Sequence, residues 1–141
     1  MNVDFTVLCP ALTLQLHFDQ WDASLQNVLE HAGTELKLCD VKSIMLQIAQ
    51  GMQYLHRQGI IHRDIKPSNI MISKSGHIKL MDFGIAKDMA LTDFTHVGTF
   101  MGSPSYMSPE QIKGTNIDVR TDLYALSVLF YEIVTAQLPY T

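Results

Sequence analysis

The sequence predicts an α+β fold that is mainly α-helical, and three observations support this prediction. Apolar residues recur at spacings of three and four over residues 41–55, which is typical of a long amphipathic helix. A second apolar segment, residues 122–134, is broken by Glu132 and is too short to span a bilayer, so we expect a buried helix there. Between these segments, residues 70–72 and 78–80 are strand-like and flank a turn signal, which predicts a short β-hairpin.

Composition excludes several classes of protein. The chain has 141 residues, of which 47% are hydrophobic and 17% charged, so it can form a core and is not a disordered chain. The net charge of -4 gives no basic excess, and we therefore expect no nucleic-acid partner. The first residues carry no basic segment typical of a signal peptide, and we expect no membrane-spanning segment and a cytoplasmic location.

The remaining elements follow in chain order. Residues 12–18 alternate between apolar and polar side chains, which predicts a strand with one buried face. A short helix is expected over residues 24–31. Asp40 is a suitable N-cap for the long helix, which we expect to end near Gly59 because glycine favours helix C-termini. Residues 84–117 are rich in glycine, proline and hydroxyl side chains and lack periodicity, which is typical of a functional loop region.

The residues that point to chemistry begin with His-Arg-Asp-Ile-Lys-Pro-Ser-Asn at positions 62–69. Asp64 and Asn69 are five residues apart and match the pattern H-R-D-x-x-x-x-N, in which the Asp accepts a hydroxyl proton and the Asn holds Mg²⁺. Asp82, in Asp-Phe-Gly, supplies a second hard oxygen of the kind that Mg²⁺ requires. The predicted hairpin should bring Asn69 and Asp82 to the same end. Further along the chain, residues 108–110, Ser-Pro-Glu, stand where the motif A-P-E follows Asp-Phe-Gly in sequences with this pattern.

With these motifs in this order, the chain resembles a eukaryotic-type serine/threonine protein kinase catalytic domain over residues 38–141. The resemblance implies ATP and Mg²⁺ as cofactors and a protein substrate with a Ser or Thr acceptor. It implies that Asp64 is the catalytic base, that Lys66 neutralises charge on the transferring phosphate, and that Asn69 and Asp82 bind the metal. Lys66, two residues after the Asp, is the Ser/Thr-kinase pattern.

The resemblance also implies roles for residues outside this set. Met71 would lie under the adenine, and Ser103 would stand in the loop that positions the substrate. Four further residues would be structural: His62, Phe83, Glu110 and Asp122. Of these, Asp122 would fix the backbone of the segment at positions 62–69, which we call the catalytic loop. The six histidines show no metal-ligand spacing, so His56 and His77 are predicted to be surface or packing residues.

A regulatory hypothesis concerns Arg63. In kinases, an Arg before the catalytic Asp pairs with a phosphorylated residue of the activation loop and thereby orders that loop. Thr95 and Thr99 are the best-placed candidates in this sequence. The alternative is that both are ordinary loop threonines.

The resemblance further implies that residues 1–141 make up a partial kinase domain, with most of the catalytic C-lobe core. Residues 12–20 resemble the last N-lobe strand and the hinge. The first glycine is Gly33 and the first lysine Lys37, so neither a Gly-rich phosphate loop nor the strand lysine precedes the catalytic loop. The later C-lobe helices are also missing, including the Arg that would pair with Glu110. We therefore expect little turnover from the chain by itself.

Two functions remain open at this stage. The first is ATP-dependent phosphoryl transfer to Ser or Thr of proteins. The alternative is a non-catalytic kinase fragment that acts as a binding module, or an incomplete gene product. Gln111 and residues 118–122 resemble the bacterial branch of the Ser/Thr kinases.

Overall fold

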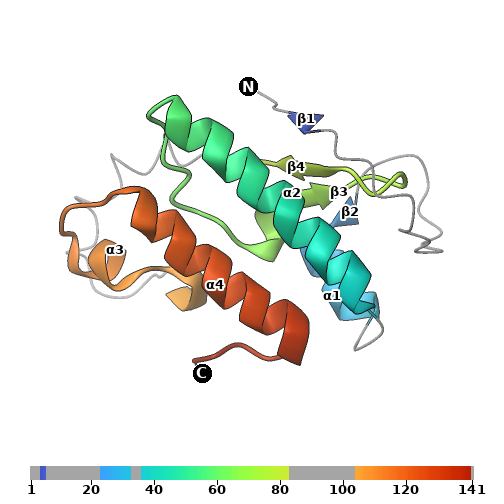
Figure 1. Ribbon diagram of the computed structural model, residues 1–141. Helices are drawn as coiled ribbons and strands as arrows, with labels where there is room; N and C mark the ends of the chain where they lie inside the picture. Colours follow the sequence, from blue (N-terminus) through green and yellow to red (C-terminus); the bar gives the residue numbers. More distant parts are fainter. Residues whose placement is uncertain (1–3, 6–22, 33–35, 83–103, 141) are drawn as a thin grey trace.

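The computed structural model describes residues 4–5, 23–32, 36–82 and 104–140. Its elements confirm the predicted α+β fold with mainly helical content (Figure 1). In chain order these are β1 (Asp4–Phe5), β2 (Ala23–Ser24), α1 (Leu25–Ala32), α2 (Leu38–Arg57), β3 (Ile70–Ile72), β4 (Ile78–Leu80), α3 (Pro109–Lys113) and α4 (Val119–Thr135), with 3₁₀ turns at Pro67–Asn69 and Pro104–Tyr106.

The strands form one antiparallel sheet with the order β1-β4-β3-β2. The predicted hairpin is confirmed: β3 pairs with β4, with Ile70 opposite Leu80 and Ile72 opposite Ile78. Alternation buries Ile70 and Ile72 and leaves Met71, opposite Lys79, on the other face. The two outer strands were not predicted, because a two-residue strand is too short to show an alternating pattern.

Helix α2 lies between the sheet and α4, and it packs against both (Figure 1). Its buried positions are largely the apolar residues that the spacing predicted. Helix α2 forms one hydrophobic core with the sheet, α1 and α4. The core is made of Leu25, Val28, Val41, Ile44, Ile48, Met52, Leu55, Ile65, Ile70, Ile72, Ile78, Leu80, Ala125, Leu129 and Ile133. The helix therefore joins the strands at one side of the catalytic loop to α4 at the other.

The ends of α2 differ in how well they were predicted. Asp40 as the N-cap was wrong: the cap is Lys37, and Asp40 lies in the first turn, where its carboxylate accepts the Lys37 backbone N–H at 3.3 Å. The predicted C-terminus is confirmed. Gly59 adopts a left-handed φ of +72°, and the Ile60 N–H returns to the Leu55 carbonyl at 2.9 Å, which closes the helix and starts the catalytic loop.

A buried glutamine joins α2 to the hairpin. Gln47 is 1% exposed, and its amide nitrogen donates to the Gly76 carbonyl at 3.0 Å. Its amide oxygen accepts the Ile78 N–H at 3.1 Å. Because both ends of the amide are bonded to hairpin backbone, Gln47 sets the position of β4 on the helix. The apolar periodicity of α2 contained no sign of this polar contact.

The C-terminal part of the chain is more helical than the apolar pattern suggested. Helix α4 starts at Val119 rather than at Asp122, because Asp118 caps it by accepting the Arg120 N–H at 2.8 Å. Helix α3 lies within the segment that was expected to be irregular. The predicted strand at 12–18, and with it the proposed hinge at 12–20, lies outside the described residues. Within the described ranges, no helix is both long enough and apolar enough to cross a membrane.

Candidate active site

The loop between α2 and β3 brings three predicted catalytic side chains together. The Asn69 amide nitrogen donates to the Asp64 carboxylate at 2.8 Å and to the Asp64 carbonyl at 2.9 Å. On the same carboxylate oxygen, the Lys66 ammonium lies 3.0 Å away. The 3₁₀ turn over Pro67–Asn69 reverses the chain so that Asn69 faces back toward Asp64. The Asp64 carboxylate is thus held by a cation and an amide.

The hairpin places Asp82 next to Asn69, as its geometry predicted. The Met81 N–H donates to the Asn69 carbonyl at 2.9 Å, which extends the β3–β4 ladder by one pair. Asp82 follows directly, is exposed, and adopts a left-handed φ of +52°. Residues that are 13 apart in sequence are therefore neighbours at one end of the hairpin.

The side chains at this end of the hairpin fit a magnesium ion. Asn69 uses its amide nitrogen toward Asp64, so the amide oxygen is its atom for a cation. Asp82 adds an exposed carboxylate. No group of three or more His, Cys, Asp or Glu that could hold a metal occurs in the part of the chain that the structure describes. Two oxygen ligands suit Mg²⁺, which is usually held by one or two carboxylates together with substrate phosphates and water.

Asp122, in the first turn of α4, holds the backbone just before Asp64. Its carboxylate is fully buried and accepts the N–H of His62 at 2.9 Å and of Arg63 at 2.8 Å. The ring nitrogen Nε2 of His56, from the last turn of α2, lies 2.7 Å from the same carboxylate. His56 was predicted to be a surface or packing residue, and the structure adds its contact with Asp122. One carboxylate joins α2, α4 and the catalytic loop.

His62 is buried beneath Asp64 and supports it. Its Nδ1 atom accepts the Asp64 N–H at 3.3 Å. Burial lowers the pKa of His62 below its ordinary value, although the nearby carboxylates of Asp122 and Asp64 oppose this shift. The lowered pKa favours the neutral imidazole, which can accept the hydrogen bond from Asp64.

The lowered pKa of His62 predicts a stability change with pH. Below about pH 6.5 the unfolded chain binds a proton at this site more readily than the folded protein does. Stability rises with pH wherever the unfolded state binds more protons, so the contribution of His62 is present above about pH 6.5 and lost as the pH falls toward the folded-state pKa. We expect His62→Phe to reduce the loss of unfolding free energy between about pH 7.5 and about pH 5.5 in urea titrations. His31→Phe, at an exposed site of α1, is the control. Equal losses in the His62 variant and the unmodified protein would contradict the prediction.

The Ser-Pro-Glu segment starts α3 with a capping box. Ser108 is fully buried, and its hydroxyl accepts the Gln111 N–H while the Gln111 side-chain oxygen accepts the Ser108 N–H at 3.0 Å. The Glu110 carboxylate accepts a hydrogen bond from the Thr121 hydroxyl at 2.9 Å. Its own backbone N–H and this hydroxyl hold the pKa of Glu110 below its usual value. The segment is therefore attached to the start of α4, beside Asp122.

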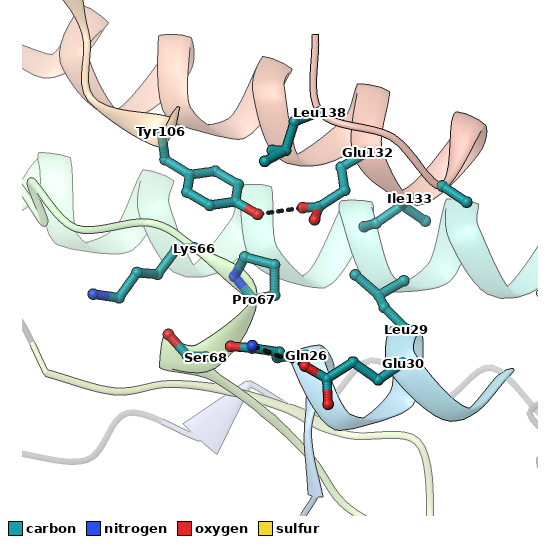
Figure 2. A pocket seen from close by; sticks show the side chains of 11 residues that line it. Gln26, Leu29, Glu30, Lys66, Pro67, Ser68, Tyr106, Glu132, Ile133 and Leu138 are labelled. Carbon is teal, nitrogen blue, oxygen red and sulfur yellow. Dashed lines mark hydrogen bonds between the residues drawn. The ribbon is translucent and has the colours of Figure 1, made fainter. Parts of the chain in front are cut away.

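A pocket of about 500 Å³ lies beside the catalytic loop (Figure 2). Lys66, Pro67 and Ser68 form one wall, and α1 and the C-terminal end of α4 form the others. Across it, the Tyr106 hydroxyl donates to the Glu132 carboxylate. Burial, together with this carboxylate, raises the pKa of Tyr106 above its usual value. The pocket therefore opens beside Lys66, on the side of the loop that faces α1 and the end of α4.

Some predicted residues are not described by the structure, and two others lie near the site. Phe83, Thr95, Thr99 and Ser103 lie outside the described residues, so the regulatory hypothesis for Arg63 stays a prediction. Arg63 itself is half-buried in the catalytic loop. Met71 is half-buried on β3, on the face opposite the core.

Sequence reasoning missed two residues that contact the site. His56 was overlooked because its contact with Asp122 joins residues 66 apart in sequence. Gln111 was noted only for its resemblance to the bacterial branch, yet its amide nitrogen donates to the Arg63 carbonyl at 2.8 Å. The position of Gln111 three residues after a serine N-cap is a signal for a capping box, and it could have been recognised.

Comparison with known proteins identifies the family of this chain. The family model for the protein kinase domain matches residues 11–141. A probable serine/threonine-protein kinase of Clostridium perfringens, CPE1738, is 48% identical over 98 residues, which are 70% of this chain and 14% of that protein. SCO3848 of Streptomyces coelicolor, also a probable serine/threonine-protein kinase, is 41% identical over 121 residues, 84% of this chain and 18% of that protein. The serine/threonine-protein kinase PknL of Mycobacterium tuberculosis is 41% identical over 101 residues, 72% of this chain and 25% of that protein.

The chain thus spans a quarter or less of the length of these three bacterial relatives. The match to the family model covers nearly all of it, including the loop, the hairpin and both long helices. Because the family model matches well over half of its residues, this chain belongs to the protein kinase domain family.

Proposed function

We propose that this chain supplies the catalytic half of an enzyme that transfers the γ-phosphoryl group of ATP to a Ser or Thr hydroxyl of a protein. One observation carries the proposal: the Asp64 carboxylate is held by the Asn69 amide at 2.8 Å and the Lys66 ammonium at 3.0 Å. A carboxylate, a cation and an amide thus converge at one point. Phosphoryl transfer depends mainly on such positioning and charge stabilisation.

Each residue would have a distinct role. Asp64 accepts the proton of the acceptor hydroxyl as its oxygen bonds to phosphorus and the bond to the leaving ADP oxygen breaks. Lys66 places positive charge beside the transferring group. Asn69 and Asp82 would hold Mg²⁺, which neutralises phosphate charge when it is bound. The acceptor segment would approach through the pocket next to Lys66.

We propose that the groups that position the nucleotide are not supplied by residues 1–141. No glycine precedes Gly33, so a Gly-rich phosphate loop cannot be formed ahead of the catalytic loop. The chain by itself should then transfer little phosphate to a Ser/Thr peptide in the presence of Mg-ATP.

A chimera tests the catalytic assignment in a setting that supplies the missing groups. The matched region of the clostridial kinase is replaced by the corresponding residues of this chain, and phosphate transfer to a Ser/Thr peptide is measured. We expect the chimera to be active and Asp64→Asn to lower its kcat by about 10²–10⁴-fold, the usual contribution of a positioned general base. The exposed variant Asp118→Asn, at the start of α4, is the matched control.

The outcomes separate the assignments. An active chimera that keeps its rate in the Asp64→Asn variant would refute Asp64 as the base. Rapid transfer by the isolated chain would refute the proposal that nucleotide positioning lies elsewhere.

The alternative function is a non-catalytic binding module. The observation in its favour is an apolar face on α4, where four residues are roughly half exposed: Leu123, Phe130, Tyr131 and Val134. Exposed apolar patches of this kind can mark interaction surfaces. An inert chimera that folds normally would favour this alternative.

A further inference from the structure

We infer that Gln111 is a positioning residue that sets the orientation of the peptide group joining Arg63 to Asp64. The Gln111 amide nitrogen donates to the Arg63 carbonyl at 2.8 Å. That carbonyl shares one rigid peptide plane with the Asp64 N–H, which donates to Nδ1 of His62 at 3.3 Å. The peptide group between Arg63 and Asp64 is therefore held at its carbonyl by Gln111 and at its N–H by His62.

The backbone needs this support because its conformation is otherwise disfavoured. Arg63 adopts a φ of +65°, in the left-handed region that side chains with a Cβ atom seldom occupy. The Arg63 N–H is fixed by Asp122 at 2.8 Å, and its carbonyl is fixed by Gln111. Two different helices, α4 and α3, thus hold the two peptide groups that flank Arg63. Release of either one allows the chain to relax toward ordinary φ values and to turn the Asp64 carboxylate away.

A simpler interpretation is that Gln111 only caps α3. Its side-chain oxygen accepts the Ser108 N–H at 3.0 Å, which is the capping-box contact. A glutamate serves that purpose equally well, since only an acceptor is required. The hydrogen bond donated to the Arg63 carbonyl is an additional contact, which the glutamine amide makes and an ionised glutamate cannot make. The two roles of Gln111 can therefore be separated by one substitution.

The consequence for catalysis is a connection between α3 and the proposed base. Gln111 follows the Ser-Pro-Glu segment directly, so the local structure of this segment determines whether the amide reaches Arg63. When α3 is capped and in place, Asp64 is held in position. The catalytic part of this inference rests on the proposed function, whereas the structural part does not.

Hydrogen exchange of backbone amides, measured by NMR on this chain, tests the contact without any turnover. Gln111→Glu keeps the acceptor for Ser108 and replaces the donor by an oxygen that repels the Arg63 carbonyl. We expect the Asp64 amide to exchange roughly three- to tenfold faster, as for the loss of one hydrogen bond, while the α3 amides keep their rates. Gln111→Met removes both contacts and should accelerate exchange at both places. Gln53→Glu, on the exposed side of α2, is the matched control.

The inference is overturned if Gln111→Glu leaves the Asp64 amide within about twofold of the unmodified protein, or if Gln111→Met accelerates only the α3 amides, as a pure cap would. In the clostridial chimera, Gln111→Glu should lower kcat and leave the KM for the peptide nearly unchanged. A chimera that is inert even with Gln111 in place would count against the proposed function. The exchange rates would then still decide the inference.

Discussion

Asp122→Ala should lower the free energy of unfolding by about 3–5 kcal/mol, the range measured when one partner of a buried charged contact is removed. The Asp122 carboxylate is fully buried and accepts the backbone N–H groups of His62 and Arg63. Without it, both donors lose their acceptor, and His56 loses its contact at 2.7 Å. Since domains are typically stable by only about 5–15 kcal/mol, this loss is a large part of the total.

Urea unfolding followed by circular dichroism measures the effect of Asp122→Ala. The matched control is Asp118→Ala in the same helix, where an exposed N-cap is lost and the cost should be much smaller. A loss of less than about 1 kcal/mol for Asp122→Ala would show that the loop does not depend on this carboxylate.

Leu129→Ala should cost about 2–5 kcal/mol, the range for truncation of a fully buried leucine. Leu129 has no exposed surface and belongs to the core between α4 and α2. The substitution removes three carbon atoms from a site enclosed by two helices that are each fixed elsewhere, so the cavity can collapse only in part. The same urea titrations give the change in unfolding free energy.

Phe130→Ala, one residue further along α4, provides the comparison for Leu129→Ala. Phe130 is 49% exposed, and surface substitutions usually change stability by no more than about 0.5 kcal/mol. A larger loss at Phe130 than at Leu129 would contradict the assignment of the two faces of α4.

Much of the scaffold could be predicted because it depends on contacts that are local in sequence. The periodicity of α2 follows from apolar side chains three and four residues apart, and the hairpin follows from two apolar triplets and a turn. Motif spacing identified the family, and hairpin geometry correctly brought Asn69 and Asp82 together. The roles of Asn69 and Asp82 remain predictions, and the chimera tests the role of Asp64.

Other features could not be predicted, because polar side chains can find partners far away in the chain. Gln47 lies on the buried face of α2, but its two partners are 29 and 31 residues away. The N-terminus of α2 was predicted at Asp40 because Asp is a favourable N-cap. An Asp in the first turn can also accept the backbone N–H of the cap residue, and this is what Asp40 does for Lys37. The two-residue strands β1 and β2 are strands only because the hairpin lies beside them.

The sequence by itself determined the family, the mainly helical fold and the set of chemical groups on the catalytic loop. These follow from residue types and short spacings, which are visible along the chain. The tertiary structure alone decided how the loop is held. Asp122 from α4 and Gln111 from α3 bond the backbone around Arg63, and His56 from α2 contacts the Asp122 carboxylate. The physical reason is that a strained backbone conformation needs hydrogen-bond partners from outside its own segment, and only packing of the helices brings those partners within reach.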